Sequence, residues 1–206
     1  MLICPTITAQ NKIEFLNQLN KIKDFAERIH LDLMDGVFTT SKSLDISEID
    51  NIDTPFDAHI MYQDPDQILD QVIALKPITI VVQFEANVNH IDLTSKIKSN
   101  GIKASLAILK QTSIEQVKSV IDLYDQIVIF SGNLGYQGGT VDLSLLNKVS
   151  QIKSFSNIQI AWDGGINQEN IKDLADGGVE VFNVGGYIQN SANAKISYES
   201  LLNSLN

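Results

Sequence analysis

The 206-residue sequence is poor in basic side chains and has a single arginine. Its 15 lysine and arginine residues stand against 25 aspartate and glutamate residues, so the formal net charge is −10 at pH 7. Nucleic acid and anionic membrane surfaces are bound through an excess of positive charge, so this balance argues against both as partners. With Arg28 as the only arginine, a phosphate group cannot be held by several guanidinium groups. Backbone N–H groups are therefore the favoured means of holding an anion.

Cysteine and long apolar runs are also scarce. Cys4 is the only cysteine, which excludes an intramolecular disulfide, and nothing around it resembles a thiol metal site. No apolar run approaches the roughly 18 residues of a membrane span. The first five residues lack the basic segment of a secretion signal. We therefore expect a cytoplasmic protein with no targeting signal and no membrane anchor.

Short apolar runs rich in β-branched residues alternate along the chain with amphipathic stretches, a pattern typical of βα units with parallel strands. The predicted strands are residues 2–6, 28–34, 56–61, 78–84, 103–108, 126–131, 158–163 and 180–184. The segment 39–53 is too irregular for a predicted helix, and Asn167 is the expected N-cap of a helix that includes Ile171 and Leu174. No linker or charge block divides the sequence, so we expect one domain over residues 1–206. Eight βα units favour a small (β/α)8 TIM barrel with short loops over a doubly wound open sheet.

Polar side chains stand near the carboxyl ends of three predicted strands. His30 and Asp32 are two residues apart on the second strand, so strand alternation points both to one face. His59 lies two residues before the end of the third strand, and Asp163 ends the seventh. Polar residues at strand ends are common, but in a (β/α)8 barrel these ends meet at one face. The four residues together predict a site for one divalent ion, such as Zn²⁺, Fe²⁺, Mn²⁺ or Co²⁺, whose identity the ligands leave open.

Glycine-rich turns follow the last three predicted strands. Residues 131–139 read Ser-Gly-Asn-Leu-Gly-Tyr-Gln-Gly-Gly, and glycine pairs follow the seventh strand (Gly164, Gly165) and the eighth (Gly185, Gly186). Glycine lets the backbone approach a ligand closely, and successive free N–H groups can hold an anion. Any one pair alone would be interpreted as a tight turn. Three such turns on consecutive strands match the usual phosphate position of these barrels and predict a phosphate site.

Four further residues have weaker interpretations. Met34 and Met61 lie beside candidate ligands, where they could fill the core or wall the pocket. His90 stands near a predicted helix start and is expected at the solvated surface. Cys4 is expected to be a small buried side chain near the barrel floor. It has no basic neighbour to activate its thiol.

The motifs resemble those of a known family. Residues 30–38, His-Leu-Asp-Leu-Met-Asp-Gly-Val-Phe, resemble the H-x-D-x-M-D-G-x-F motif of ribulose-phosphate 3-epimerases, and residues 58–61, Ala-His-Ile-Met, resemble their H-L-M motif. Residues 133–139 resemble the family's N-P-G-F-G-G-Q loop, residues 162–166 its V-D-G-G-V turn, and residues 183–186 its A-G-S phosphate turn. The match is collinear from residue 5 to residue 186, and the first two motifs are the specific ones.

The resemblance implies a (β/α)8-barrel isomerase of the pentose phosphate pathway that interconverts D-ribulose 5-phosphate and D-xylulose 5-phosphate through an enediolate. It implies that His30, Asp32, His59 and Asp163 bind the catalytic metal, and that Asp32 and Asp163 are the acid/base pair. It also suggests a homo-oligomer. The residues expected near the sugar phosphate are Thr6, His59, Gly135, Tyr136, Gln137, Gly138, Gly164, Gly165, Gly185 and Gly186.

The sequence departs from the family pattern in several loops. The family's F-V-P-N is Phe-Thr-Thr-Ser at residues 38–41, its L-N-P-x-T is Ile-Leu-Lys-Gln-Thr at 108–112, and its H-x-E is Gln-Phe-Glu at 83–85. None of these changes removes a candidate metal ligand. The alternatives are an epimerase of another ketose phosphate, such as allulose 6-phosphate, and a hexulose-phosphate synthase-like lyase. A non-catalytic sugar-phosphate-binding barrel is a third alternative, which the complete ligand set argues against.

Overall fold

Eight strands and their connecting helices make up the computed structural model, which describes residues 1–49 and 52–205. The strands are β1 (Leu2–Ile7), β2 (Ile29–Met34), β3 (Phe56–Met61), β4 (Thr79–Gln83), β5 (Lys103–Ile108), β6 (Gln126–Phe130), β7 (Gln159–Asp163) and β8 (Val181–Val184). The α-helices are α1 (Lys12–Ile22), α2 (Asp66–Ala74), α3 (His90–Ser99), α4 (Ile114–Val117), α5 (Leu146–Lys153), α6 (Ile171–Asp176), α7 (Gly186–Gln189) and α8 (Ala194–Leu205). Three short 3-10 turns are η1 (Ile46–Glu48), η2 (Ile121–Leu123) and η3 (Leu143–Leu145).

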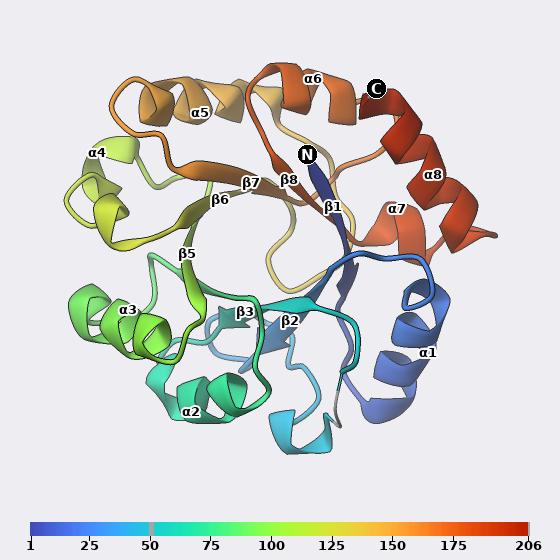
Figure 1. Ribbon diagram of the computed structural model, residues 1–206, viewed down its shortest axis with the longest axis horizontal. Coiled ribbons are helices and arrows are strands. Elements are labelled where there is room, and N and C mark those ends of the chain that lie inside the picture. The colour runs from blue at the N-terminus through green and yellow to red at the C-terminus, as the bar shows by residue number, and fades with distance from the viewer. Residues whose placement is uncertain (50–51, 206) are drawn as a thin grey trace.

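The strands form a closed parallel barrel in sequence order, β1 to β8. The ring closes where β1 pairs with β8, with Cys4 opposite Asn183. Figure 1 shows the strands as a ring with the helices outside it, and α8 beside α1 at the point where the chain returns to its start. The predicted (β/α)8 TIM barrel and its strand order are therefore confirmed.

The alternation of side chains along each strand divides the core in two. Outward-facing residues such as Leu31 and Leu33 pack against the helices in a large apolar cluster that includes the fully buried Trp162. The barrel interior holds a smaller cluster of Cys4, Val81, Ala107, Val128, Ala161 and Val181. These side chains come from β1 and from β4 to β8, and they form a packed core at the barrel axis. Cys4 is fully buried there, so its expected burial is confirmed.

Two local expectations can be compared with the helices. In the segment 39–53, the described residues contain no α-helix and only the turn η1, as its irregular pattern predicts. Asn167 is not the N-cap of α6, because the helix begins at Ile171 after Asn170. Asn167 instead accepts a hydrogen bond from the backbone N–H of Glu169 in the preceding turn. Within the described residues, no helix is long and apolar enough to cross a membrane.

The only arginine lies at the opposite end of the barrel from the strand ends that carry the candidate ligands. Arg28 directly precedes β2, and its guanidinium lies 3.5 Å from the buried carboxylate of Asp57 at the start of β3. Burial raises the pKa of Asp57, and the nearby Arg28 charge opposes that shift. Arg28 is thus committed to a structural ion pair, away from the glycine turns expected to hold the phosphate.

Candidate metal centre

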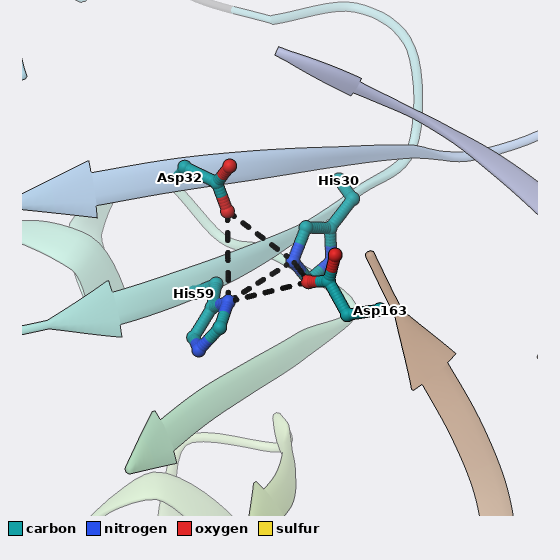
Figure 2. Close-up of side chains that lie close together, drawn as sticks. All are labelled: His30, Asp32, His59 and Asp163. Carbon is teal, nitrogen blue, oxygen red and sulfur yellow. Dashed lines mark hydrogen bonds and ion pairs between the residues drawn. The ribbon is translucent and has the colours of Figure 1, made fainter. Parts of the chain in front are cut away.

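The four candidate ligands converge inside the barrel because of strand register. Asp32 on β2 is the register partner of His59 on β3, so both side chains point inward at the same height. His30 lies one inward position below Asp32 on β2, and Asp163 is the last residue of β7. Figure 2 shows the four side chains pointing toward one another from these three strands. All four residues are less than a tenth exposed.

The ligand atoms are close to equally spaced. His30 Nε2 lies 3.3 Å from His59 Nδ1, 3.5 Å from Asp32 Oδ1 and 3.4 Å from Asp163 Oδ2. His59 Nδ1 lies 3.5 Å from Asp32 Oδ1 and 3.7 Å from Asp163 Oδ2. One atom from each residue therefore falls within a single small cluster.

This spacing fits one divalent ion. Four ligand atoms held about 2.0 to 2.2 Å from one ion at the corners of a tetrahedron lie about 3.3 to 3.6 Å apart. Asp32 Oδ1 is buried and has no hydrogen-bond donor in the described structure, as expected of an atom that faces a cation. Two imidazoles and two carboxylates form a donor set that suits several first-row ions. The described residues therefore have both the geometry and the chemistry of a metal site.

The closeness of the histidines and carboxylates also shifts the pKa values of these groups in the protein without an ion. Burial lowers the pKa of His59, but its close contacts with the carboxylates of Asp163 and Asp32 outweigh burial and raise this pKa to about 9. Burial acts to raise the pKa of Asp163, but hydrogen bonds from His30 and His59 lower it below its usual range. The carboxylates and a protonated imidazole thus stabilise one another until an ion takes the place of the proton.

Two residues outside the predicted set contact the ligands. Thr8, just after β1, donates a hydrogen bond of 2.6 Å from Oγ1 to Asp32 Oδ2. The amide Nε2 of the fully buried Gln83 lies 3.0 Å from His59 Nε2, the ring nitrogen that faces away from the cluster. Sequence reasoning missed the roles of both. Gln83 was noted only as a departure from the H-x-E motif, and Thr8 was not singled out.

A pocket of about 250 Å³ opens above the ligands. Most of the residues expected near the substrate line it: Thr6, Asp32, Met61, Gly135, Tyr136, Gln137, Gly138, Asp163, Gly164, Gly165, Gly185 and Gly186. His30 and His59 are not among the lining residues, because they lie beneath the carboxylates. Met34 is buried and borders a smaller neighbouring hollow, so only Met61 walls the main pocket. The pocket also takes in Thr8, Phe130, Asn167, Tyr187 and Asn190, which sequence reasoning did not select.

Two glycines on one side of the pocket are required by backbone geometry. Gly164 and Gly165 have φ angles of 100° and 76°, in the region that favours glycine. A Cβ atom at Gly164 would lie 2.1 Å from the backbone nitrogen of Gly132, and one at Gly165 would lie 2.4 Å from that of Val141. The turn after β7 therefore packs directly against the loop after β6.

The loop after β6 reaches across the barrel mouth. The Gln137 amide Nε2 donates a hydrogen bond of 3.0 Å to Gln18 Oε1 on α1. The Tyr136 hydroxyl lies 3.1 Å from the Thr40 hydroxyl. The loop thus spans from β6 to the segments that follow β1 and β2 and covers the pocket between them.

The divergent loops lie beside this pocket. Residues 39–41 and 109–113 are absent from its described lining. Residues 39–41 support the glycine loop, since a Cβ at Gly135 would lie 3.0 Å from Thr39 Cβ. The loop 109–113 is fixed by Lys148, whose Nζ donates hydrogen bonds of 2.8, 2.8 and 2.7 Å to the carbonyls of Leu109, Lys110 and Thr112.

The expectation for His90 was wrong. Its ring is half-buried and stacks on Phe84 with 5.6 Å between ring centroids. Its Nδ1 lies 2.6 Å from the Tyr124 hydroxyl. Two aromatic neighbours, one of them a distant residue in sequence, hold this side chain away from full solvent exposure.

Comparisons with known proteins agree with this site. The model of the ribulose-phosphate 3-epimerase family matches residues 2–189. A ribulose-phosphate 3-epimerase of Buchnera aphidicola subsp. Acyrthosiphon pisum is 28% identical over 211 residues, covering 97% of this chain and 92% of that protein. One from Helicobacter pylori strain J99 is 24% identical over 212 residues, covering 98% and 97%. Among solved structures, a 3-hexulose-6-phosphate synthase superposes with a TM-score of 0.77 at 15% identity over the whole of both chains.

The match to a solved structure at so low an identity shows the (β/α)8 fold alone. The family model and the curated relatives together define an enzyme of the isomerase class, an epimerase built on this barrel. The chain belongs to the ribulose-phosphate 3-epimerase family. The resemblance that the sequence motifs indicate is therefore confirmed.

Proposed function

We propose that the protein is a metal-dependent epimerase that interconverts D-ribulose 5-phosphate and D-xylulose 5-phosphate, a reaction of the pentose phosphate pathway. The observation that carries the proposal is the cluster of His30, Asp32, His59 and Asp163 at the floor of a pocket lined by glycine turns. Family membership supplies the substrate class, a sugar phosphate.

Asp32 and Asp163 are proposed as the two acid/base groups. Epimerisation at the carbon beside a ketone requires removal of a proton from one face of that carbon and return of a proton to the other. The two carboxylates reach the pocket from β2 and β7, which are separated in the ring by β1 and β8. In each direction one carboxylate is ionised and takes the proton, while the other is protonated and gives one. Their roles exchange when the reaction reverses.

His30, Asp32, His59 and Asp163 are proposed to hold one divalent ion. When bound, that ion supplies positive charge that stabilises the enediolate oxygens, which a free carboxylate base could not do alone. The histidines lie beneath the carboxylates and contribute ligands only. This arrangement leaves the pocket side of both carboxylates for the substrate carbon.

The phosphate group is proposed to bind at the glycine turns after β7 and β8. Gly164, Gly165, Gly185 and Gly186 line the pocket with backbone, where successive N–H groups can hold an anion. The loop after β6, with Gly135, Tyr136, Gln137 and Gly138, covers the sugar and excludes water. Thr6, at the end of β1, lines the same pocket and is proposed to contact the substrate.

The test is proton NMR of D-ribulose 5-phosphate with the purified protein in heavy water, before and after chelation and metal restoration. We expect xylulose 5-phosphate with deuterium at carbon 3, formed only by the metal-loaded protein. A folded, metal-loaded protein that leaves this substrate unchanged would overturn the pentose assignment. Allulose 6-phosphate is the next substrate to test, and cleavage of a 3-hexulose 6-phosphate to D-ribulose 5-phosphate and formaldehyde would instead indicate the lyase reaction.

A further inference from the structure

Asp32 makes a second contact that the proposed mechanism does not use. Thr8 lies one residue beyond the end of β1, and its Oγ1 donates a hydrogen bond of 2.6 Å to Asp32 Oδ2. The other carboxylate oxygen, Oδ1, points to the two histidines at 3.5 Å each and accepts no hydrogen bond in the described structure. The two oxygens of one carboxylate thus have different partners, a hydroxyl on one side and the ligand cluster on the other.

The Thr8 hydroxyl is held in place by its backbone. Gln18 on α1 accepts a 3.0 Å hydrogen bond from the Thr8 N–H through Oε1, and its Nε2 donates one of 2.9 Å to the Thr8 carbonyl. Thr8 lies beyond the end of β1 and does not pair with a neighbouring strand there. The Gln18 side chain therefore satisfies both the backbone N–H and the backbone carbonyl of Thr8. A β-branched residue also has few χ1 rotamers. The hydroxyl is therefore presented to Asp32 from a fixed position.

Asp163 lacks this arrangement. Its Oδ2 faces His30 at 3.4 Å and His59 at 3.7 Å, and no hydroxyl hydrogen-bonds to its carboxylate among the described contacts. The two carboxylates that the proposed mechanism treats as a pair therefore differ in what surrounds them. The difference is one hydrogen bond, and it comes from Thr8.

We propose that Thr8 is a positioning residue for Asp32. Its hydroxyl fixes the rotation of the carboxylate, so that Oδ1 is held toward the ligand cluster and Oδ2 is held at the pocket wall. The hydrogen bond is charge-assisted, and its length is typical of a strong O–H···O⁻ contact. This inference rests on the proposed function, because it assigns Asp32 the roles of ligand and acid/base group.

The experiment compares Thr8→Val, which has nearly the same shape without the hydroxyl, with Thr8→Ser, which keeps it. Thr94→Val is the matched control, because the buried Thr94 hydroxyl also makes a short hydrogen bond, at 2.7 Å, but to the His90 carbonyl on α3. For each protein, kcat and KM are measured with D-ribulose 5-phosphate. The dissociation constant of Co²⁺ is measured on the metal-free protein by the visible absorbance of the bound ion. Denaturant unfolding reports the stability of each variant.

We expect Thr8→Val to lower kcat by about 10- to 100-fold, the range for a hydrogen bond to a charged group, with KM changed by less than about threefold. Its Co²⁺ dissociation constant should rise by about tenfold, as when other hydrogen bonds that orient a metal ligand are removed. Thr8→Ser should restore both values to within about threefold, and Thr94→Val should alter neither.

Two results would overturn the inference while the proposed function stands. One is a Thr8→Val protein with wild-type kcat and Co²⁺ affinity. The other is a Thr8→Ser protein as impaired as Thr8→Val, which would assign the effect to side-chain shape. If the wild-type protein turns over no pentose phosphate but Thr8→Val still weakens Co²⁺ binding and Thr8→Ser restores it, the substrate assignment fails and the role of Thr8 is supported. A wild-type protein that binds no Co²⁺ would overturn both.

Discussion

Asp32 and His59 are register partners on adjacent parallel strands, and their side chains meet at 3.5 Å inside the barrel. The backbone hydrogen bonds between β2 and β3 fix their relative height, so neither residue depends on a loop for its position. Asp163 reaches the same point from the end of β7. A site built on strands in this way is held more rigidly than one built on loops. The loops provide the cover of the pocket and its glycine turns.

The first prediction concerns the second carboxylate. Asp163→Asn keeps the shape of the side chain but removes the negative charge that the proposed mechanism uses to take and return a proton. We expect the turnover of D-ribulose 5-phosphate to fall by at least about 100-fold, the lower range for loss of an acid/base group. Circular dichroism should show a folded protein. Near-normal turnover by Asp163→Asn would exclude it as an acid/base residue.

The second prediction concerns pH and metal binding. The pKa of His59 is raised to about 9 in the protein without an ion, so below that pH an incoming ion must displace a proton. Metal affinity should therefore rise with pH, by up to about tenfold per unit between pH 7 and pH 9, and level off above it. Co²⁺ titrations across this range, with the released protons counted in weakly buffered solution, check the prediction. An affinity independent of pH would contradict it.

The third prediction concerns His90. Burial lowers the pKa of His90, so in acid the unfolded chain binds a proton that the folded protein resists. Its contribution to stability is present above the unfolded pKa, about 6.5, and is lost as pH falls through the lower folded value. The free energy of unfolding of the wild type, measured relative to His90→Phe, should therefore fall between pH 8 and pH 5. If the free energy of unfolding of the wild type relative to His90→Phe stays constant or increases in acid, the prediction is contradicted.

The fourth prediction concerns the loop 109–113. Lys148→Met removes the ammonium that binds three carbonyls and leaves those carbonyls without their donor. We expect the free energy of unfolding to fall by about 2 to 3 kcal/mol. The kcat should stay within about threefold of the wild type, because this loop does not line the main pocket in the described structure. Urea unfolding and kinetics measure the two effects. Lys195→Met, at an exposed lysine paired only with Glu199, is the control and should change stability little.

Much of the site could be predicted from the sequence because strand periodicity carries the information. His30 and Asp32 share a face by simple alternation, and the barrel rule gathers the ends of β2, β3 and β7 at one mouth. The glycine turns were found in the same way, and their positions in the pocket agree with that interpretation. Thr8 and Gln83 were missed because Thr8 stands in no motif and Gln83 replaces the histidine of one. Each is identified only by the atom it contacts across the barrel.

The sequence by itself determined the fold class, the family and the four residues that converge at the candidate metal centre, because these depend on local periodicity and on residue type at strand ends. Only the tertiary structure decided that Met61 rather than Met34 walls the main pocket, and that His90 is half-buried between Phe84 and Tyr124. It also decided that the hydroxyl of Thr8, just after β1, donates a hydrogen bond to one of the two carboxylates. The physical reason is that such contacts join residues far apart in the chain, and their geometry is fixed by barrel closure and not by any local pattern.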